Sequence, residues 1–128
     1  HGIGPLAMMA NINRGNRFTQ LVSYGSKARG LHEHVVKMGG ASHPNAHIDF
    51  KLSDVVTTMI STTSGETVLL QHDTNLPRPY SLGFRVQGTN GIWMDINKSI
   101  YLEGKSKEPH RWEDAKEWLD KYDHPLWK

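Results

Sequence analysis

The side chains best suited to chemistry gather in one short segment of the sequence, from His72 to Tyr80. It reads His-Asp-Thr-Asn-Leu-Pro-Arg-Pro-Tyr and joins two apolar stretches that are typical of strands. A plain connection between strands needs turn residues such as asparagine and aspartate, but it does not need an imidazole, a guanidinium and a phenol as well. The two prolines favour extended backbone at Leu76 and Arg78, the residues that precede them. Because stiff polar loops beside a sheet are frequent locations of binding residues, this segment is the first candidate site.

Residues of this segment also have a structural interpretation. Tyr80 could be a half-buried core residue with its hydroxyl at the rim, and His72 could pair with a backbone carbonyl at the end of a strand. Asp73 is the one carboxylate in the segment, whereas glycosidases of the usual kind need two carboxylates flanking the scissile bond. Residue types and spacing alone therefore leave the active-site and the structural interpretations equally open.

Other patterns in the sequence favour neither a metal site nor a nucleotide site. His32 and His34 flank a glutamate, but two valines follow, so the metalloprotease pattern His-Glu-x-x-His is absent. A proline and an asparagine lie between His43 and His47, which favours a loop rather than one face of a helix. The chain has no cysteine and no Gly-x-Gly-x-x-Gly turn. We therefore predict no metal site and no dinucleotide fold within this chain.

The composition indicates an ordinary globular domain. The 128 residues are 37% hydrophobic and 22% charged, which suffices for one domain with a hydrophobic core. The formal net charge is +2 and the basic residues are scattered, so we expect no nucleic-acid partner. No apolar stretch has the length of a membrane-spanning helix.

The elements that must position the candidate loop follow from the apolar pattern and the turn residues. Pro5 favours the start of a first helix and Gly15 its end, while β-branched and aromatic residues favour strands. The last helix carries its apolar residues in one stripe. We expect helices at residues 5–12, 26–38 and 112–122, and strands at residues 17–24, 55–62, 67–72, 80–87, 92–96 and 99–102.

Short strands joined by tight turns predict an α+β fold, with a mostly antiparallel open sheet and helices packed on one face. We expect about five or six strands in this sheet. In the strand at residues 55–62 neither face is strongly charged, and one of them is rich in threonine. Because sheet faces of this kind are often covered, we predict a homo-oligomer that associates through the open sheet face.

The two ends of the sequence favour a piece of a longer protein. The sequence begins within an apparently structured motif, His1-Gly2-Ile3-Gly4-Pro5, and ends at Pro125-Leu126-Trp127-Lys128 without a polar tail. The alternative is that His1 and Gly2 remain from an expression tag. No signal peptide is visible, so the chain itself does not indicate a compartment.

Several long motifs resemble one enzyme family. They are His1-Gly2-Ile3-Gly4-Pro5, Asn11-Ile12-Asn13-Arg14-Gly15-Asn16-Arg17-Phe18, Ser26-Lys27-Ala28-Arg29-Gly30, residues 72–81, Arg85-Val86-Gln87-Gly88 and His124-Pro125-Leu126-Trp127. Together they resemble the C-terminal part of the NAD-dependent α-N-acetylgalactosaminidases, glycoside hydrolase family 109, within the Gfo/Idh/MocA oxidoreductase superfamily. The resemblance covers nearly the whole chain.

This resemblance implies an architecture and a reaction. Family members hold NAD in an N-terminal Rossmann domain. Residues 1–128 would therefore be the C-terminal substrate and oligomerisation domain of a longer protein, and the Rossmann domain of that protein is absent from this chain. The implied reaction begins with hydride transfer from the sugar C3 to NAD. A base then removes the acidified C2 proton, the aglycone leaves, water adds and the hydride returns. This route needs no pair of carboxylates.

The resemblance also assigns site residues. His1 matches a histidine that contacts the sugar in the family and is the candidate catalytic residue, because an imidazole can accept or relay a proton near neutral pH. Tyr80 matches the substrate tyrosine of the family. His72, Asn75 and Arg78 are further candidates for substrate binding because of their place in the same loop. Whether His1 or Tyr80 acts as the base stays open.

Two other functions remain as alternatives. The parent protein could be an NAD(P)-dependent sugar dehydrogenase with net oxidation, or this chain could be a non-catalytic oligomerisation or carbohydrate-binding module. We expect a carbohydrate substrate and an inactive isolated chain, because the cofactor would be bound by the missing domain. Bacterial relatives are often exported, so the resemblance suggests the periplasm or another exported location.

Overall fold

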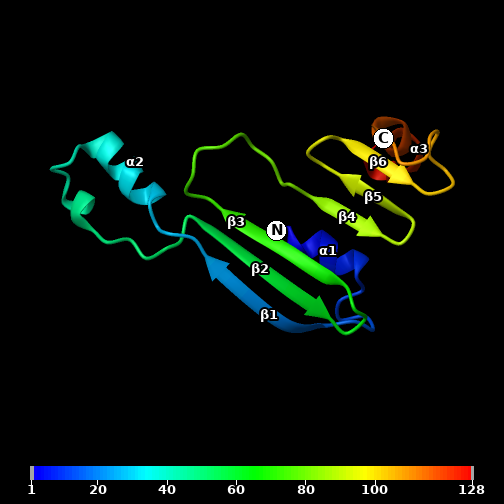
Figure 1. Cartoon of the computed structure of the whole chain (residues 1–128), viewed down its shortest axis with the longest axis horizontal. Coiled ribbons are helices and arrows are strands. Elements are labelled where there is room, and N and C mark those ends of the chain that lie inside the picture. Colours follow the sequence, from blue (N-terminus) through cyan, green and yellow to red (C-terminus); the bar gives the residue numbers. More distant parts are fainter. Residues whose placement is uncertain (1, 128) are drawn as a thin grey trace. The chain divides into compact units, whose positions relative to one another are not determined.

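A computed structural model describes residues 2–127 and contains short helices and antiparallel strands, with the strands between Val55 and Asp114 following one another directly (Figure 1). The chain divides into two compact units, one ending at Arg78 and the other beginning at Pro79. The predicted α+β class is confirmed, and the strands form open antiparallel sheets. The elements are α1 (Ile3–Met9), β1 (Phe18–Gly25), α2 (Gly30–Gly39), η1 (Pro44–His47), β2 (Val55–Thr62), β3 (Thr67–Asp73), β4 (Arg85–Gly88), β5 (Gly91–Met94), β6 (Ser99–Leu102), β7 (Glu113–Asp114), α3 (Lys116–Tyr122) and η2 (Pro125–Trp127).

The first unit is built on a three-stranded antiparallel sheet in the order β1-β2-β3. Its strands are rich in β-branched residues, which suit a pleated surface. Val22 lies opposite Met59, and Met59 lies opposite Leu69, so these three side chains share one face of the sheet. All three are exposed, whereas Ile60 and Val68 on the opposite face are buried. One face of the sheet is therefore buried only at Ile60 and Val68, since Leu21 on the same face is 64% exposed, and the other face exposes its apolar side chains.

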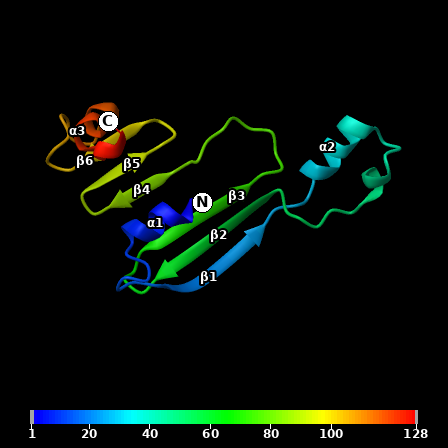
Figure 2. The same cartoon turned by 180° about the vertical axis from the view of Figure 1, so that it is seen from behind.

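A helical segment follows β1 in the first unit. In both views α2 and η1 lie beyond one end of the β1-β2-β3 sheet rather than over its face (Figure 1, Figure 2). The buried carboxylate of Asp54 accepts hydrogen bonds from the backbone N–H groups of Arg29 and Gly30, each 2.8 Å long. Because the first N–H groups of a helix lack partners within it, these bonds stabilise the start of α2.

The second unit holds a four-stranded antiparallel sheet in the order β4-β5-β6-β7. Trp93 in β5 lies opposite Val86 and Ile100, and its ring packs against Phe84 at a centroid distance of 6.0 Å. Ala115, between β7 and α3, is buried. The core of this unit is therefore small and formed mainly by half-buried aromatic and aliphatic residues.

The strands form two sheets where we expected one, and several element boundaries differ for local reasons. The expected strand at residues 80–87 is regular only from Arg85, because Gly83 has a φ of +60° and interrupts the extended backbone. The last helix begins at Lys116, since Glu113 and Asp114 pair with β6 as a short strand.

The helices also differ from the sequence pattern in length and burial. α1 ends at Met9 because Asn11 and Asn13 adopt left-handed backbone, with φ of +54° and +62°. α2 begins only at Gly30, because Ser26 still donates its backbone N–H to the Val55 carbonyl beside the end of β1. No residue within α1, α2 or α3 is buried, so the helical surface expected to pack on a sheet is largely exposed in this chain.

Candidate functional site

An ion pair between Asp73 and Arg78 closes the candidate loop at the end of the first unit. Arg78 Nε lies 3.1 Å from Asp73 Oδ2, and Arg78 Nη2 donates to the Asp73 carbonyl oxygen at 3.3 Å. The guanidinium therefore contacts both the side chain and the backbone of the residue that ends β3. Because Pro77 also restricts the backbone before Arg78, the segment from Asp73 to Arg78 forms a closed loop with a fixed path.

The second oxygen of the Asp73 carboxylate is buried and has no hydrogen-bond partner within residues 2–127. Buried carboxylate oxygens without a partner are uncommon, because desolvation disfavours the charged form. A hydroxyl or N–H donor supplied by a ligand or by another part of the protein would satisfy this oxygen. Asp73 therefore binds Arg78 through Oδ2 and offers Oδ1 as a hydrogen-bond acceptor.

The middle of the candidate loop, at Asn75 and Leu76, lies close to Gly30 at the start of α2. A Cβ added to Gly30 would lie 2.6 Å from the carbonyl oxygen of Asn75 and 3.0 Å from a methyl carbon of Leu76. Only a residue without a side chain permits this approach. The glycine that begins α2, together with the Asp54 carboxylate bound to its N–H, therefore positions the candidate loop.

His72 and Tyr80 are both exposed. His72 lies opposite Val56 near the end of β3. Tyr80 is 89% exposed, so it is not the half-buried core residue of the structural interpretation. It belongs to the second unit, where it borders an open hollow of about 470 Å³ lined by Tyr80, Ser81, Leu82, Asp95, Ile96 and Lys98.

The far wall of this hollow is the turn between β5 and β6. Asp95 donates its backbone N–H to the Phe84 carbonyl at 2.8 Å, which ties the turn to the segment after Tyr80. The carboxylate of Asp95 pairs with the ammonium of Lys98. Lys98 has a φ of +50°, and its carbonyl accepts a 2.8 Å hydrogen bond from the N–H of the buried Ala115. The wall is therefore held by backbone hydrogen bonds on both sides.

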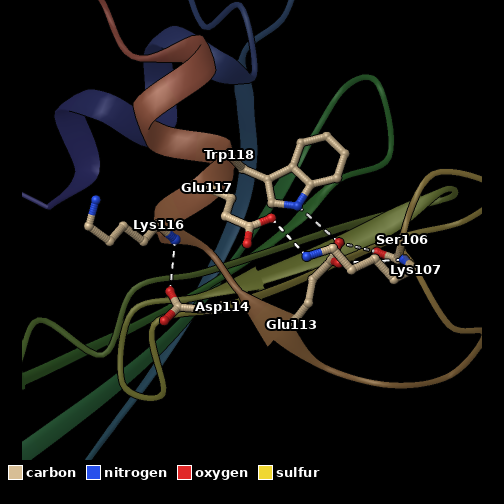
Figure 3. A network of polar contacts seen from close by, with 7 residues as sticks. All are labelled: Ser106, Lys107, Glu113, Asp114, Lys116, Glu117 and Trp118. Carbon is tan, nitrogen blue, oxygen red and sulfur yellow. Dashed lines mark hydrogen bonds and ion pairs between the residues drawn. The ribbon is translucent and has the colours of Figure 1, made fainter.

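A polar network surrounds the segment from β7 to α3, which includes Ala115 (Figure 3). The carboxylate of Glu113 accepts hydrogen bonds from the Ser106 hydroxyl at 2.7 Å and from the Trp118 indole N–H at 2.9 Å. The Ser106 hydrogen bond is the larger cause that lowers the pKa of Glu113 below its ordinary value, and the Trp118 bond acts in the same direction against partial desolvation. Lys107 pairs with Glu117 on α3 at 2.9 Å. The network joins the loop after β6 to β7 and α3.

The described residues do not fit a dinucleotide. Every paired strand of the two sheets is antiparallel, and no strand leads into a helix through a Gly-x-Gly-x-x-Gly turn within residues 2–127. We therefore derive no chemical step through NAD from this chain. The same residues contain no group of three side chains able to hold a metal ion, and none of their helices combines the length and apolar character that crossing a bilayer requires.

The sequence-predicted site residues lie in different parts of the chain. His1 falls outside the described residues. His72, Asn75 and Arg78 belong to the first unit and Tyr80 to the second. Arg78 forms an ion pair with Asp73 of the same loop, and the Asn75 side-chain oxygen accepts a 3.4 Å hydrogen bond from the Thr74 hydroxyl. Sequence analysis included Ser81 in the motif at residues 72–81 but did not single out the other residues that share the hollow with Tyr80. Leu82 lies in the segment after Tyr80, whereas Asp95, Ile96 and Lys98 lie in the turn between β5 and β6, whose sequence signal was the polar pair Asn97-Lys98.

The fold defines a class: an open α+β domain without a nucleotide-binding fold among residues 2–127. The family described as glycosyl hydrolase 109, C-terminal domain, matches residues 1–128, and the chain belongs to this family. A glycosyl hydrolase family 109 protein of Stenotrophomonas maltophilia is 61% identical over the full chain, which spans 28% of that relative. An alpha-N-acetylgalactosaminidase of Tannerella forsythia is 59% identical over 99% of the chain, which spans 27% of it.

A third relative, a glycosyl hydrolase family 109 protein of Parabacteroides distasonis, is 56% identical over 99% of the chain and 27% of its own length. The chain thus spans little more than a quarter of the curated relatives it matches. The family resemblance noted from the sequence motifs is confirmed, and the matched portion corresponds to the C-terminal domain of the family.

Proposed function

We propose that the protein containing this chain is a glycosidase that hydrolyses α-N-acetylgalactosaminides. The observation that carries the proposal is the family match over residues 1–128, together with 59% identity to a relative named alpha-N-acetylgalactosaminidase. Within that protein this chain supplies sugar-contacting side chains. The cofactor that we propose, NAD, is held by parts of the protein outside this chain.

Tyr80 is the proposed sugar-binding residue within the described part of the chain. Its exposed ring offers an apolar surface to the C–H face of a pyranose, and its hydroxyl offers a hydrogen bond to a sugar hydroxyl. His1 is proposed as a second sugar contact and proton-transfer residue, on the strength of the motif that it begins. Asp73 and Arg78 hold the shape of the loop that precedes Tyr80.

The test is an assay of the full protein with an aryl α-N-acetylgalactosaminide. We expect release of free N-acetylgalactosamine without accumulation of NADH, because the proposed reaction returns the cofactor to its starting state. Net formation of NADH with a free sugar would instead identify a sugar dehydrogenase. The isolated chain of residues 1–128 serves as the control and should release no sugar above background.

We also propose that the protein self-associates through the open face of the β1-β2-β3 sheet. The support is the uncharged stripe formed by Val22, Met59 and Leu69, which leaves three apolar side chains exposed in register. An exported or periplasmic location stays a prediction from the resemblance.

A further inference from the structure

The hollow beside Tyr80 has apolar lining from two further residues. Leu82 and Ile96 line the same hollow and are 69% and 68% exposed. Three large apolar side chains with most of their surface exposed are thus gathered around one concave site. Contiguous exposed apolar surface of this kind commonly marks a binding site, whereas single exposed apolar residues need no explanation.

The hollow is held open by contacts that do not involve its apolar side chains. The Ser81 hydroxyl accepts the N–H of Gly83 at 3.1 Å on one wall, and the Ala115 N–H binds the Lys98 carbonyl on the other. The hydrogen bond from the Asp95 N–H to the Phe84 carbonyl joins the two walls. A hollow whose shape depends on the backbone is available without rearrangement, as ligand sites usually are.

The charges of the hollow favour a neutral ligand. The two charged residues that line it, Asp95 and Lys98, form an ion pair with each other. A charged ligand would have to compete with this pair, whereas a neutral ligand can bury apolar surface against Leu82 and Ile96 and leave the pair intact. The volume of about 470 Å³ lies in the range typical of small-molecule sites.

We infer that this hollow binds the aglycone of the glycoside substrate and that Leu82 and Ile96 determine a preference for aglycones with apolar surface. The inference rests on the proposed glycosidase function, in which Tyr80 contacts the sugar. Because Leu82 and Ile96 line the same hollow as Tyr80, they are the apolar residues available to a group attached to a sugar bound at Tyr80.

The test compares two substrates that differ in the apolar surface of the aglycone rather than in the acidity of the leaving alcohol. These are the benzyl and methyl α-N-acetylgalactosaminides, assayed with the full protein. The Leu82→Ser and Ile96→Ser variants should each lower the benzyl-to-methyl ratio of kcat/KM by about tenfold, the usual effect of losing one apolar contact in a pocket. We expect the change to appear mainly in KM.

A matched control uses an equally apolar and exposed residue outside the hollow. Leu52 is 57% exposed and does not line it, so Leu52→Ser should leave the ratio unchanged. The milder variants Leu82→Ala and Ile96→Val give the same comparison with smaller changes if a serine variant fails to fold.

The outcomes separate this inference from the function on which it rests. Normal hydrolysis of both glycosides with an unchanged ratio in the Leu82 and Ile96 variants would overturn the aglycone site and leave the glycosidase function standing. A wild-type protein that hydrolyses neither glycoside would overturn the proposed function and the aglycone site together.

Discussion

Asn16 joins three segments of the first unit through a single buried amide. Its Nδ2 donates to the Ala10 carbonyl at 2.8 Å and to the Glu66 carboxylate at 3.0 Å. Its Oδ1 accepts the backbone N–H groups of Arg17 at 2.9 Å and Ser64 at 3.1 Å. The end of α1, the start of β1 and the β2–β3 turn therefore meet at one side chain whose donors and acceptor are all used.

Replacing Asn16 by alanine should lower the free energy of unfolding of the protein by about 3 kcal/mol, because the hydrogen bonds of the buried Asn16 amide to Ala10, Glu66, Arg17 and Ser64 are lost at once. The measurement is chemical denaturation of wild type and variant. Asn90 is exposed in the turn between β4 and β5, so Asn90→Ala is the control and should change stability by less than about 0.5 kcal/mol. Equal stability of the two variants would show that the Asn16 network contributes little.

The Asn16 network also changes the ionisation of Glu66. The Thr62 hydroxyl is the first cause that lowers the pKa of the Glu66 carboxyl below its ordinary value of 4.5, and the Asn16 amide is the second. A lowered pKa in the folded state means that this contribution to stability is present at neutral pH and is lost as the pH falls through the folded-state pKa. The β2–β3 turn is therefore expected to weaken at acidic pH.

The candidate site shows what residue patterns can and cannot predict. The polar loop before Tyr80 could be recognised in the sequence because it contains imidazole, guanidinium and phenol side chains, which a turn does not require. The family motif then selected Tyr80, but Leu82 and Ile96 remained unrecognised, since an isolated apolar residue in a loop carries no signal in the sequence. Their role depends on a shared hollow between two segments, and such proximity is a property of the fold.

At the scale of elements, the contact between α2 and the candidate loop depends on Gly30. A side chain at this position would meet the Asn75 carbonyl at 2.6 Å and an Asp54 carboxylate oxygen at 3.1 Å. Both neighbours are constrained, because one is backbone and the other binds the first N–H groups of α2. A side chain at Gly30 must therefore displace either the loop backbone at Asn75 or the Asp54 carboxylate that binds the start of α2.

The Gly30→Ala variant should destabilise the protein by about 1–3 kcal/mol, the usual effect of overpacking a closely packed site. It should also raise the KM for the aryl glycoside, because the loop before Tyr80 is displaced. Gly4→Ala in α1 is the matched control, since a Cβ there meets nothing within 4 Å and alanine favours helix by about 0.5–1 kcal/mol. Denaturation curves and initial rates of both variants test the expectation, which fails if Gly30→Ala behaves like Gly4→Ala.

Element boundaries were predictable where the local sequence alone determines them. β2 and β6 begin and end at the expected residues, because runs of β-branched, aromatic or aliphatic residues are bounded by turn residues on both sides. The division of the strands into two sheets was not predictable, since it depends on which strands pair. Glu113 and Asp114 form a strand instead of the expected helix for the same reason, because they pair with Ile100 and Ser99, which are remote in the sequence.

At the scale of the whole molecule, the chain buries little of its apolar surface. Ala46, Ile60, Val68 and Ala115 are its buried apolar residues within the described range. The open face of the β1-β2-β3 sheet contributes exposed apolar surface, and a face of this composition is suited to association with an identical face, as in a two-fold symmetric dimer. Each copy would then cover the Val22, Met59 and Leu69 stripe of the other.

This arrangement predicts that a charge in the centre of the stripe weakens self-association. Met59 lies on the central strand between Val22 and Leu69, so Met59→Lys would bring two ammonium groups into an apolar interface across the two-fold axis, where neither has a partner. We expect the dissociation constant to rise at least about a hundredfold, measured by sedimentation equilibrium of the full protein. Met8→Lys, at an exposed position of α1 outside the sheet, is the control and should leave association unchanged. A monomeric wild-type protein, or a Met59→Lys variant that associates as tightly as wild type, would exclude this face as the interface.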